Sequence, residues 1–137
     1  MKLLIATPDA VVAALDDVTA VTAEDASGSF GILPGHEDLV TALDVSVVSW
    51  SERNGRRRFC AVRGGVLTMR NGSEIAIATG EALIADDLAR LDEQVLAKLR
   101  ADAEEERTAH AHAEQLRVQA MRQILTFLRP GRRSVEL

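Results

Sequence analysis

Residues 2 to about 80 alternate between apolar and polar positions with the two-residue period of β-strands. Ile75 and Ile77 fall on one face of a strand, and Glu74 falls on the opposite face. Turn-forming pairs such as Asn54-Gly55 and Asn71-Gly72 interrupt the pattern at intervals of roughly 8–15 residues. Many short strands separated by regular turns predict a β-sandwich or barrel for this part of the chain.

Near residue 85 the pattern changes from the period of a strand to that of a helix. Asp86 and Asp87 are suited to the N-cap and first turn of a helix. Two apolar stripes follow at helical spacing, namely Leu88, Leu91, Val95 and Leu99, and then Ala113, Leu116, Ala120, Ile124 and Phe127. Pro130-Gly131 predicts that the helical part ends near Leu128 or Arg129.

The segment between the two stripes, residues 108–112, contains neither Gly nor Pro. One uninterrupted helix would expose both stripes to water, so we expect the chain to fold back here. A partner surface could stabilise the extended helix instead, which would make the segment a switch between two arrangements. The predicted fold is α+β, with an N-terminal all-β sandwich over residues 1–84 and a C-terminal two-helix antiparallel hairpin over residues 85–137.

Composition and charge narrow the classes of function. Among 137 residues, a hydrophobic content of 47% supports a packed core, and a single cysteine excludes an intrachain disulfide. The net charge of −5 argues against a general nucleic-acid-binding protein. No apolar run approaches the length expected of a membrane span or a signal peptide. Charge is uneven in the helical part, because residues 84–114 are mainly acidic and residues 115–137 mainly basic.

Few residues are candidates for catalysis or metal binding. His36 lies beside Glu37 and Asp38, but no nucleophile accompanies them, so we interpret His36 as a hydrogen-bonding residue on a partner surface. His110 and His112 would point in different directions on a helix and could not share a metal ion. We therefore predict no catalytic residue, no metal site and no bound cofactor.

Two further features lie within the predicted strands. Cys60 alternates with Phe59 and Ala61, which predicts a buried and unreactive thiol. Arg56-Arg57-Arg58 follows a hairpin turn and is interpreted as a solvated basic strand edge that discourages aggregation.

Residues 28–43, GSFGILPGHEDLVTAL, stand out from the strand pattern. Three glycines and a proline fall in the first nine residues, together with several apolar side chains, which predicts a shaped loop flanked by strands. The stretch resembles the G-x-x-G-I-L-P-G-H-x-x-L-x-T-A-L signature of the ε subunits of F-type ATP synthases. Residues 62–67, VRGGVL, resemble the Gly-Gly turn between two strands in the same family.

The resemblance implies a non-catalytic rotor subunit in the central stalk of an F-type ATP synthase. Such a subunit couples ion flow through a membrane ring to ATP synthesis in the F1 head, and its helices can restrain ATP hydrolysis. The implied partners are the γ subunit, the ring of c subunits and, through the C-terminal helices, the α and β subunits. The implied location is the cytoplasmic face of the inner membrane, as a peripheral part of F1.

The resemblance also implies specific contact residues. The positions that match the ring-contacting loop are Ser29, Phe30, Gly31, Pro34, Gly35 and His36. The basic side chains that match the inhibitory helix are Arg117, Arg122 and Arg129.

Some ε subunits bind ATP through an (I/L)-D-x-x-R-A motif, to which residues 91–96, LDEQVL, are the nearest match. Val95 and Leu96 replace the Arg and Ala of the motif, so the charged donor that a phosphate needs is missing. We expect weak or absent ATP binding.

Two other functions fit the residues. The first is a free-standing β-sandwich adaptor that self-associates through its helical tail. The second is a small enzyme that uses His36 with Glu37 or Asp38.

Overall fold

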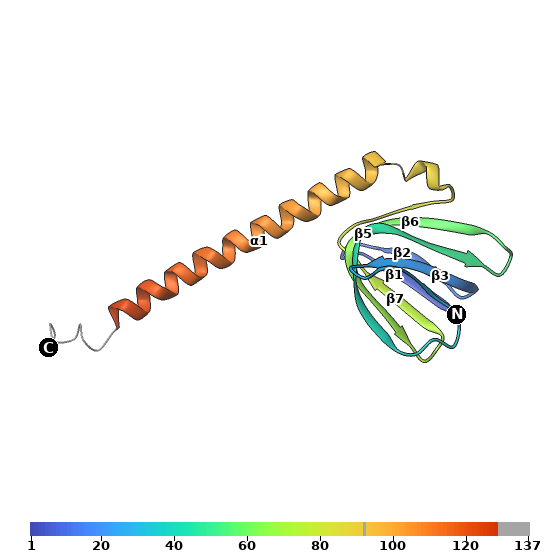
Figure 1. Cartoon of the computed structure of the whole chain (residues 1–137), viewed down its shortest axis with the longest axis horizontal. Coiled ribbons are helices and arrows are strands. Elements are labelled where there is room, and N and C mark those ends of the chain that lie inside the picture. The colour runs from blue at the N-terminus through green and yellow to red at the C-terminus, as the bar shows by residue number, and fades with distance from the viewer. Residues whose placement is uncertain (92, 129–137) are drawn as a thin grey trace. The chain divides into compact units, whose positions relative to one another are not determined.

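The computed structural model describes residues 1–91 and 93–128, and Figure 1 shows their strands and helices. The strands are β1 (Lys2–Ala6), β2 (Val11–Leu15), β3 (Val18–Asp25), β4 (Gly28–Ile32), β5 (Leu39–Glu52), β6 (Arg57–Arg70), β7 (Glu74–Ala78) and β8 (Ala82–Ala85). The helices are η1 (Leu88–Arg90), a short 3-10 helix, and α1 (Glu93–Phe127). The all-β character predicted for the N-terminal part is confirmed. By its internal contacts the chain divides into two compact units, residues 1–103 and residues 104–137.

The described strands form an eight-stranded sheet in the order β2-β1-β7-β6-β5-β3-β4, with β8 paired to β6. All pairings are antiparallel except that of β1 with β7. The two central strands, β5 and β6, each have 14 residues and pair along almost their whole length. The first half of β6 pairs with β8 and its second half with β7. These two strands therefore belong to both halves of the sheet.

The two halves of the sheet face each other across one hydrophobic core. The buried side chains include Leu3, Ile5, Val21, Ile32, Val48, Trp50, Cys60, Val62, Leu67, Met69, Ile75 and Ile77. They come from both halves, and they alternate along each strand with side chains that point away from this core. The faces predicted for Ile75 and Ile77, and the burial of the Cys60 thiol, are confirmed.

A second, smaller apolar cluster covers the opposite face of the half of the sheet that contains β8. Ala61 on β6 is fully buried beneath Leu91 and Leu99, the latter from the start of α1. Partly buried side chains complete the cluster: Val45, Val47, Phe59, Ala85, Val95 and Leu96. Three members of the first apolar stripe, Leu91, Val95 and Leu99, thus pack against the sheet, whereas Leu88 is exposed.

The predicted two-helix hairpin is wrong, because residues 93–127 form one α-helix of 35 residues. Two physical reasons account for the difference. The first stripe already has the sheet as its partner, so it does not need the second stripe. The segment expected to turn, residues 108–112, lacks Gly and Pro, and exposed ion pairs between Glu104 and Arg107 and between Glu114 and Arg117 support the helix on either side of it.

The predicted Gly-Gly turn between two strands is also wrong, because Gly64 and Gly65 lie inside β6. Both have positive φ angles, +70° and +118°, and Gly64 has no paired residue on β5, although Gly65 pairs with Leu43 and Arg63 pairs with Val45. Only glycine adopts such angles readily. A Cβ on Gly65 would lie 2.1 Å from the carbonyl oxygen of Ala78. The pair is therefore a kink that redirects β6 from one half of the sheet to the other.

We call the part of the chain that contains strands β1 to β8 the β-domain. We predict that Gly65→Ala destabilises the β-domain by about 2–4 kcal/mol, because strain at φ of +118° adds to the clash with the backbone of β7. The matched control is Gly31→Ala, where the nearest atom to an added Cβ is 3.8 Å away, and its cost should stay below about 1 kcal/mol. Urea unfolding followed by the fluorescence of Trp50, the single tryptophan, measures both. Equal costs for the two variants would contradict the kink's role.

Candidate functional site

The stretch predicted as one shaped loop is divided between a strand and a loop. Gly28–Ile32 is strand β4, so the expectation that this part is irregular was wrong. Phe30 is half-buried and Ile32 fully buried against the core, whereas Ser29 and Gly31 are exposed. This two-residue alternation is that of a strand, and it outweighs the glycine content. The loop itself is residues 33–38, which we call the lip.

The lip is held against the turn that joins β6 to β7. The backbone N–H of Gly35 donates to the carbonyl oxygen of Gly72 over 2.7 Å. The carboxylate of Asp38 accepts from the backbone N–H of Asn71 over 3.0 Å. A Cβ on Gly72 would lie 3.1 Å from the Cα of Gly35, so a residue without a side chain permits this close approach. The lip therefore has a defined shape.

Asp25 fixes the chain on the other side of β4. Its Oδ1 accepts a hydrogen bond from the backbone N–H of Ser27 over 2.9 Å, and its Oδ2 accepts one from the hydroxyl of Thr41 over 2.7 Å. Hydrogen bonds from Ser27, and then from Thr41, hold the pKa of Asp25 below its ordinary value. The turn before β4 is thereby tied to β5, the strand that follows the lip.

The residues predicted to contact the ring lie together on β4 and the lip. Pro34, Gly35 and His36 are exposed on the lip, next in the chain to the exposed Ser29 and Gly31 on β4. Phe30 differs, because its side chain packs partly against the core.

The described part of the chain gives His36 no catalytic setting. Its Nδ1 lies 2.7 Å from the carbonyl oxygen of Glu37 in an exposed turn. Among residues 1–91 and 93–128, no group of three or more His, Cys, Asp and Glu side chains is placed to hold a metal ion.

The basic residues predicted for an inhibitory helix lie on α1 where the structure describes them. Arg117 is exposed and pairs with Glu114 over 2.9 Å. Arg122 is also exposed on the same helix. Arg129 lies outside the described residues. The positions that would carry the Arg and Ala of an ATP-binding motif, Val95 and Leu96, pack against the sheet.

A further surface, which sequence reasoning missed, lies on the half of the sheet that contains β1 and β7. The strand registers place its outward side chains in two parallel rows. The first row is Val40, Thr68, Ala76, Leu4 and Ala14, and the second is Ala42, Val66, Ala78, Ala6 and Val11. All are exposed or partly exposed, including Val40 at 73% and Val11 at 63%. We call these two rows the outer face.

The outer face is apolar and has a charged margin. Thr68 is its one polar side chain, and no charge falls in either row. The next row toward the lip consists of Arg70, Glu74 and Lys2, all exposed. A contiguous apolar area bounded by polar residues is typical of a protein–protein contact. One feature of the sequence indicates this surface. Strand β1 is apolar at consecutive positions, and this pattern is typical of strands that are buried on both faces.

Burial raises the pKa of the Cys60 thiol to about 11. The side chain is fully buried in the core. A thiol of this kind remains protonated near neutral pH and is a poor nucleophile.

In the described residues, no helix is both long and apolar enough to cross a membrane.

Comparison with known proteins gives concordant matches. Residues 1–85 match the family "ATP synthase, Delta/Epsilon chain, beta-sandwich domain". The chain is 39% identical over 132 residues to ATP synthase epsilon chain 2 of Paraburkholderia xenovorans, covering 96% of this chain and 95% of that one. It is 39% identical over 120 residues to ATP synthase epsilon chain 2 of Cereibacter sphaeroides, covering 88% of this chain and 81% of that one.

Solved structures give the same picture of the fold. A chain in the OSCP/F1/c-ring structure of the Euglena gracilis mitochondrial ATP synthase aligns with a TM-score of 0.60 at 26% identity. The alignment covers 70% of this chain and 58% of that chain. A chain in the central stalk/c-ring structure of the Tetrahymena thermophila mitochondrial ATP synthase aligns with a TM-score of 0.52 at 17% identity, covering 61% of this chain and 65% of that chain.

We predict that Cys60 makes the folded protein less stable at alkaline pH. The unfolded thiol ionises near its ordinary pKa of 9.0, whereas the folded thiol keeps its proton up to about pH 11. Stability should therefore fall between these values by about 2–3 kcal/mol, at about 1.4 kcal/mol per pKa unit. Urea unfolding at pH 8, 9, 10 and 11 should show this loss in the natural chain and not in Cys60→Ala. Parallel pH profiles for the two proteins would refute the prediction.

Proposed function

Since this chain belongs to the ATP synthase delta/epsilon family, whose ε members are non-catalytic subunits, we propose that it is a central-stalk subunit that couples ion translocation to ATP synthesis. The uncovered outer face is the observation that carries this proposal. An isolated domain gains nothing from two rows of exposed apolar side chains, whereas a subunit of a larger assembly buries them. In this function the chain acts by binding and position.

The outer face is the proposed docking surface for the γ subunit. Its side chains are mostly Ala and Val, so a partner backbone or flat sheet can approach closely. The margin of Arg70, Glu74 and Lys2 carries both signs of charge, which favours one orientation of the partner over others.

The lip, with the exposed residues of β4, is the proposed contact with the ring of c subunits. Hydrogen bonds to Gly72 and Asn71 hold the lip in one shape before any partner arrives. A preformed loop loses less conformational entropy on binding than a flexible one. His36 and Pro34 are exposed at its tip and are available to a neighbouring chain.

The second unit of the chain is the proposed regulatory element. Within residues 104–128, apolar side chains on α1 are exposed, including Leu116 at 53% and Ile124 at 58%. Arg117 and Arg122 lie on the same stretch, and Arg129 follows in the sequence. A helix that is both apolar and basic suits a groove with acidic margins on the α or β subunits. Binding there would obstruct rotation and restrain ATP hydrolysis.

We predict that Ala76→Glu and Val40→Glu each weaken binding to the γ subunit by about 30-fold or more, because each places a charge in an apolar contact. The matched control is Leu83→Glu on β8, a side chain that is also exposed (43%) but lies outside the outer face. Its binding should remain within about twofold of the natural chain. Titration of purified γ with each variant measures the affinities.

Either of two results would count against this docking surface. One is undiminished γ binding by both outer-face variants. The other is a natural chain that self-associates and ignores γ, which would favour the adaptor function.

We predict that removing residues 104–137 raises ATP hydrolysis by the whole complex by about fivefold or more. The cut leaves Leu99 buried on the sheet, so the β-domain keeps its cover. A companion variant, Arg117→Gln with Arg122→Gln, should give part of the same rise. The measurement is the ATPase rate of the membrane-bound complex. An unchanged rate after truncation would argue against an inhibitory role for this unit.

A further inference from the structure

The helical part of the chain leaves the sheet at Asp86. This residue follows directly after β8 and precedes η1, whose N-cap is Asp87. The side chain of Asp87 accepts from the backbone N–H of Ala89 over 3.0 Å and so serves the helix itself. Asp86 is left to contact the sheet.

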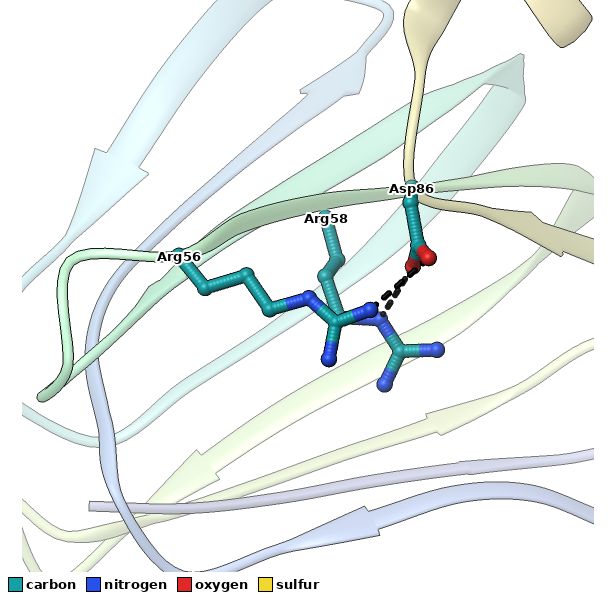
Figure 2. A network of polar contacts seen from close by, with 3 residues as sticks. All are labelled: Arg56, Arg58 and Asp86. Carbon is teal, nitrogen blue, oxygen red and sulfur yellow. Dashed lines mark hydrogen bonds and ion pairs between the residues drawn. The ribbon is translucent and has the colours of Figure 1, made fainter.

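Two arginines from the start of β6 and the turn before it hold the carboxylate of Asp86, as Figure 2 shows. An Nη of Arg56 lies 2.7 Å from one carboxylate oxygen, and the Nε of Arg58 lies 3.1 Å from the other. Both oxygens are therefore engaged by separate guanidinium groups. The residues are 28 and 30 positions away from Asp86 in the chain, so this contact joins distant segments. We call it the fork.

Arg58 is the better-anchored member of the fork. Its guanidinium lies 6.0 Å from the centre of the Trp50 ring, and its side chain is 23% exposed, compared with 50% for Arg56. Trp50 is a fully buried core residue. The contact with Trp50 thus fixes the position of Arg58 independently of its ion pair with Asp86. The hydrogen bond from Arg56, together with the charges of both arginines, holds the pKa of Asp86 below its ordinary value.

The segment from Asp86 to Leu99 is attached to the sheet at two places of different chemistry. The fork is polar and largely exposed, so salt should weaken it. The cluster of Leu91 and Leu99 on Ala61 is buried and apolar, so salt should not weaken it. The fork comes first in the chain and therefore sets where the helical part departs from β8.

We propose that the fork of Arg56, Arg58 and Asp86 is a positioning device that fixes the exit of the helical part. It holds the chain at Asp86 while Leu91 and Leu99 pack, and its release allows the segment after β8 to change path without opening the sheet. This anchoring can be tested without the assembly. Its consequence for ATP hydrolysis rests on the proposed function.

The test is hydrogen–deuterium exchange on the full chain. Asp86→Asn keeps the shape of the side chain and removes its charge. We expect amide exchange in residues 88–91 and 93–99 to rise about three- to tenfold, with β1 to β7 unchanged, because an exposed two-point ion pair is a modest restraint. Arg58→Gln should give part of this rise, because Arg56 still holds one carboxylate oxygen, and the double variant should add little to Asp86→Asn. In 1 M NaCl the natural chain should approach Asp86→Asn.

The matched control is Glu104→Gln, which breaks an exposed ion pair with Arg107 further along α1. Exchange in residues 88–91 and 93–99 should not change in this variant. The proposal is overturned if Asp86→Asn behaves like the control, or if exchange rises across the whole sheet. Neither result depends on γ binding or ATPase activity, so failure of this inference and failure of the proposed function are separate outcomes.

Discussion

The burial of Leu91 and Leu99 against Ala61 is the contact on which the organisation of this chain depends. It covers one outer surface of the folded sheet with residues of the chain itself. It also buries most of the first apolar stripe of the helical part against the sheet. Folding back against the second stripe would therefore bury little additional apolar surface of the first. Most of the exposed large apolar side chains then fall on the outer face or on residues 104–128, apart from Leu33, Leu83 and Leu88. These two surfaces are left for other proteins.

The second constraint is the kink at Gly64 and Gly65. It allows β6, together with β5, to take part in both halves of the sheet, so a single core is enclosed without a break in the central strand pair. The half that carries β1 and β7 is thereby presented with its outward side chains in register. The turn after β6 also supports the lip through Gly72 and Asn71. The part of β6 beyond the kink, with the turn that follows it, thus contributes to both proposed contact surfaces.

Sequence reasoning reached the strand region, the position of the change to helix, the burial of Cys60 and the family. These depend on short-range periodicity and on motifs. The hairpin prediction failed because it compared the two stripes with each other and not with the sheet, and only the fold shows that Leu99 lies on Ala61. The strand character of β4 was hidden by glycines, although Phe30 and Ile32 alternate correctly. The outer face and the fork require strand registers and contacts across about 30 residues, which no local pattern contains.

Burial of the outer face in the assembled complex can be measured directly by labelling an engineered thiol on it. Ala76→Cys places a thiol at the centre of the outer face. The natural Cys60 should not react with maleimide, because it is fully buried. Asn54→Cys, at the exposed tip of the β5–β6 turn, is the reference. Maleimide should label both engineered thiols in the free chain, and in the ATP synthase complex only the Ala76→Cys thiol should be protected relative to the reference. Equal labelling of Ala76→Cys in the free chain and in the complex would show that no other subunit covers the outer face.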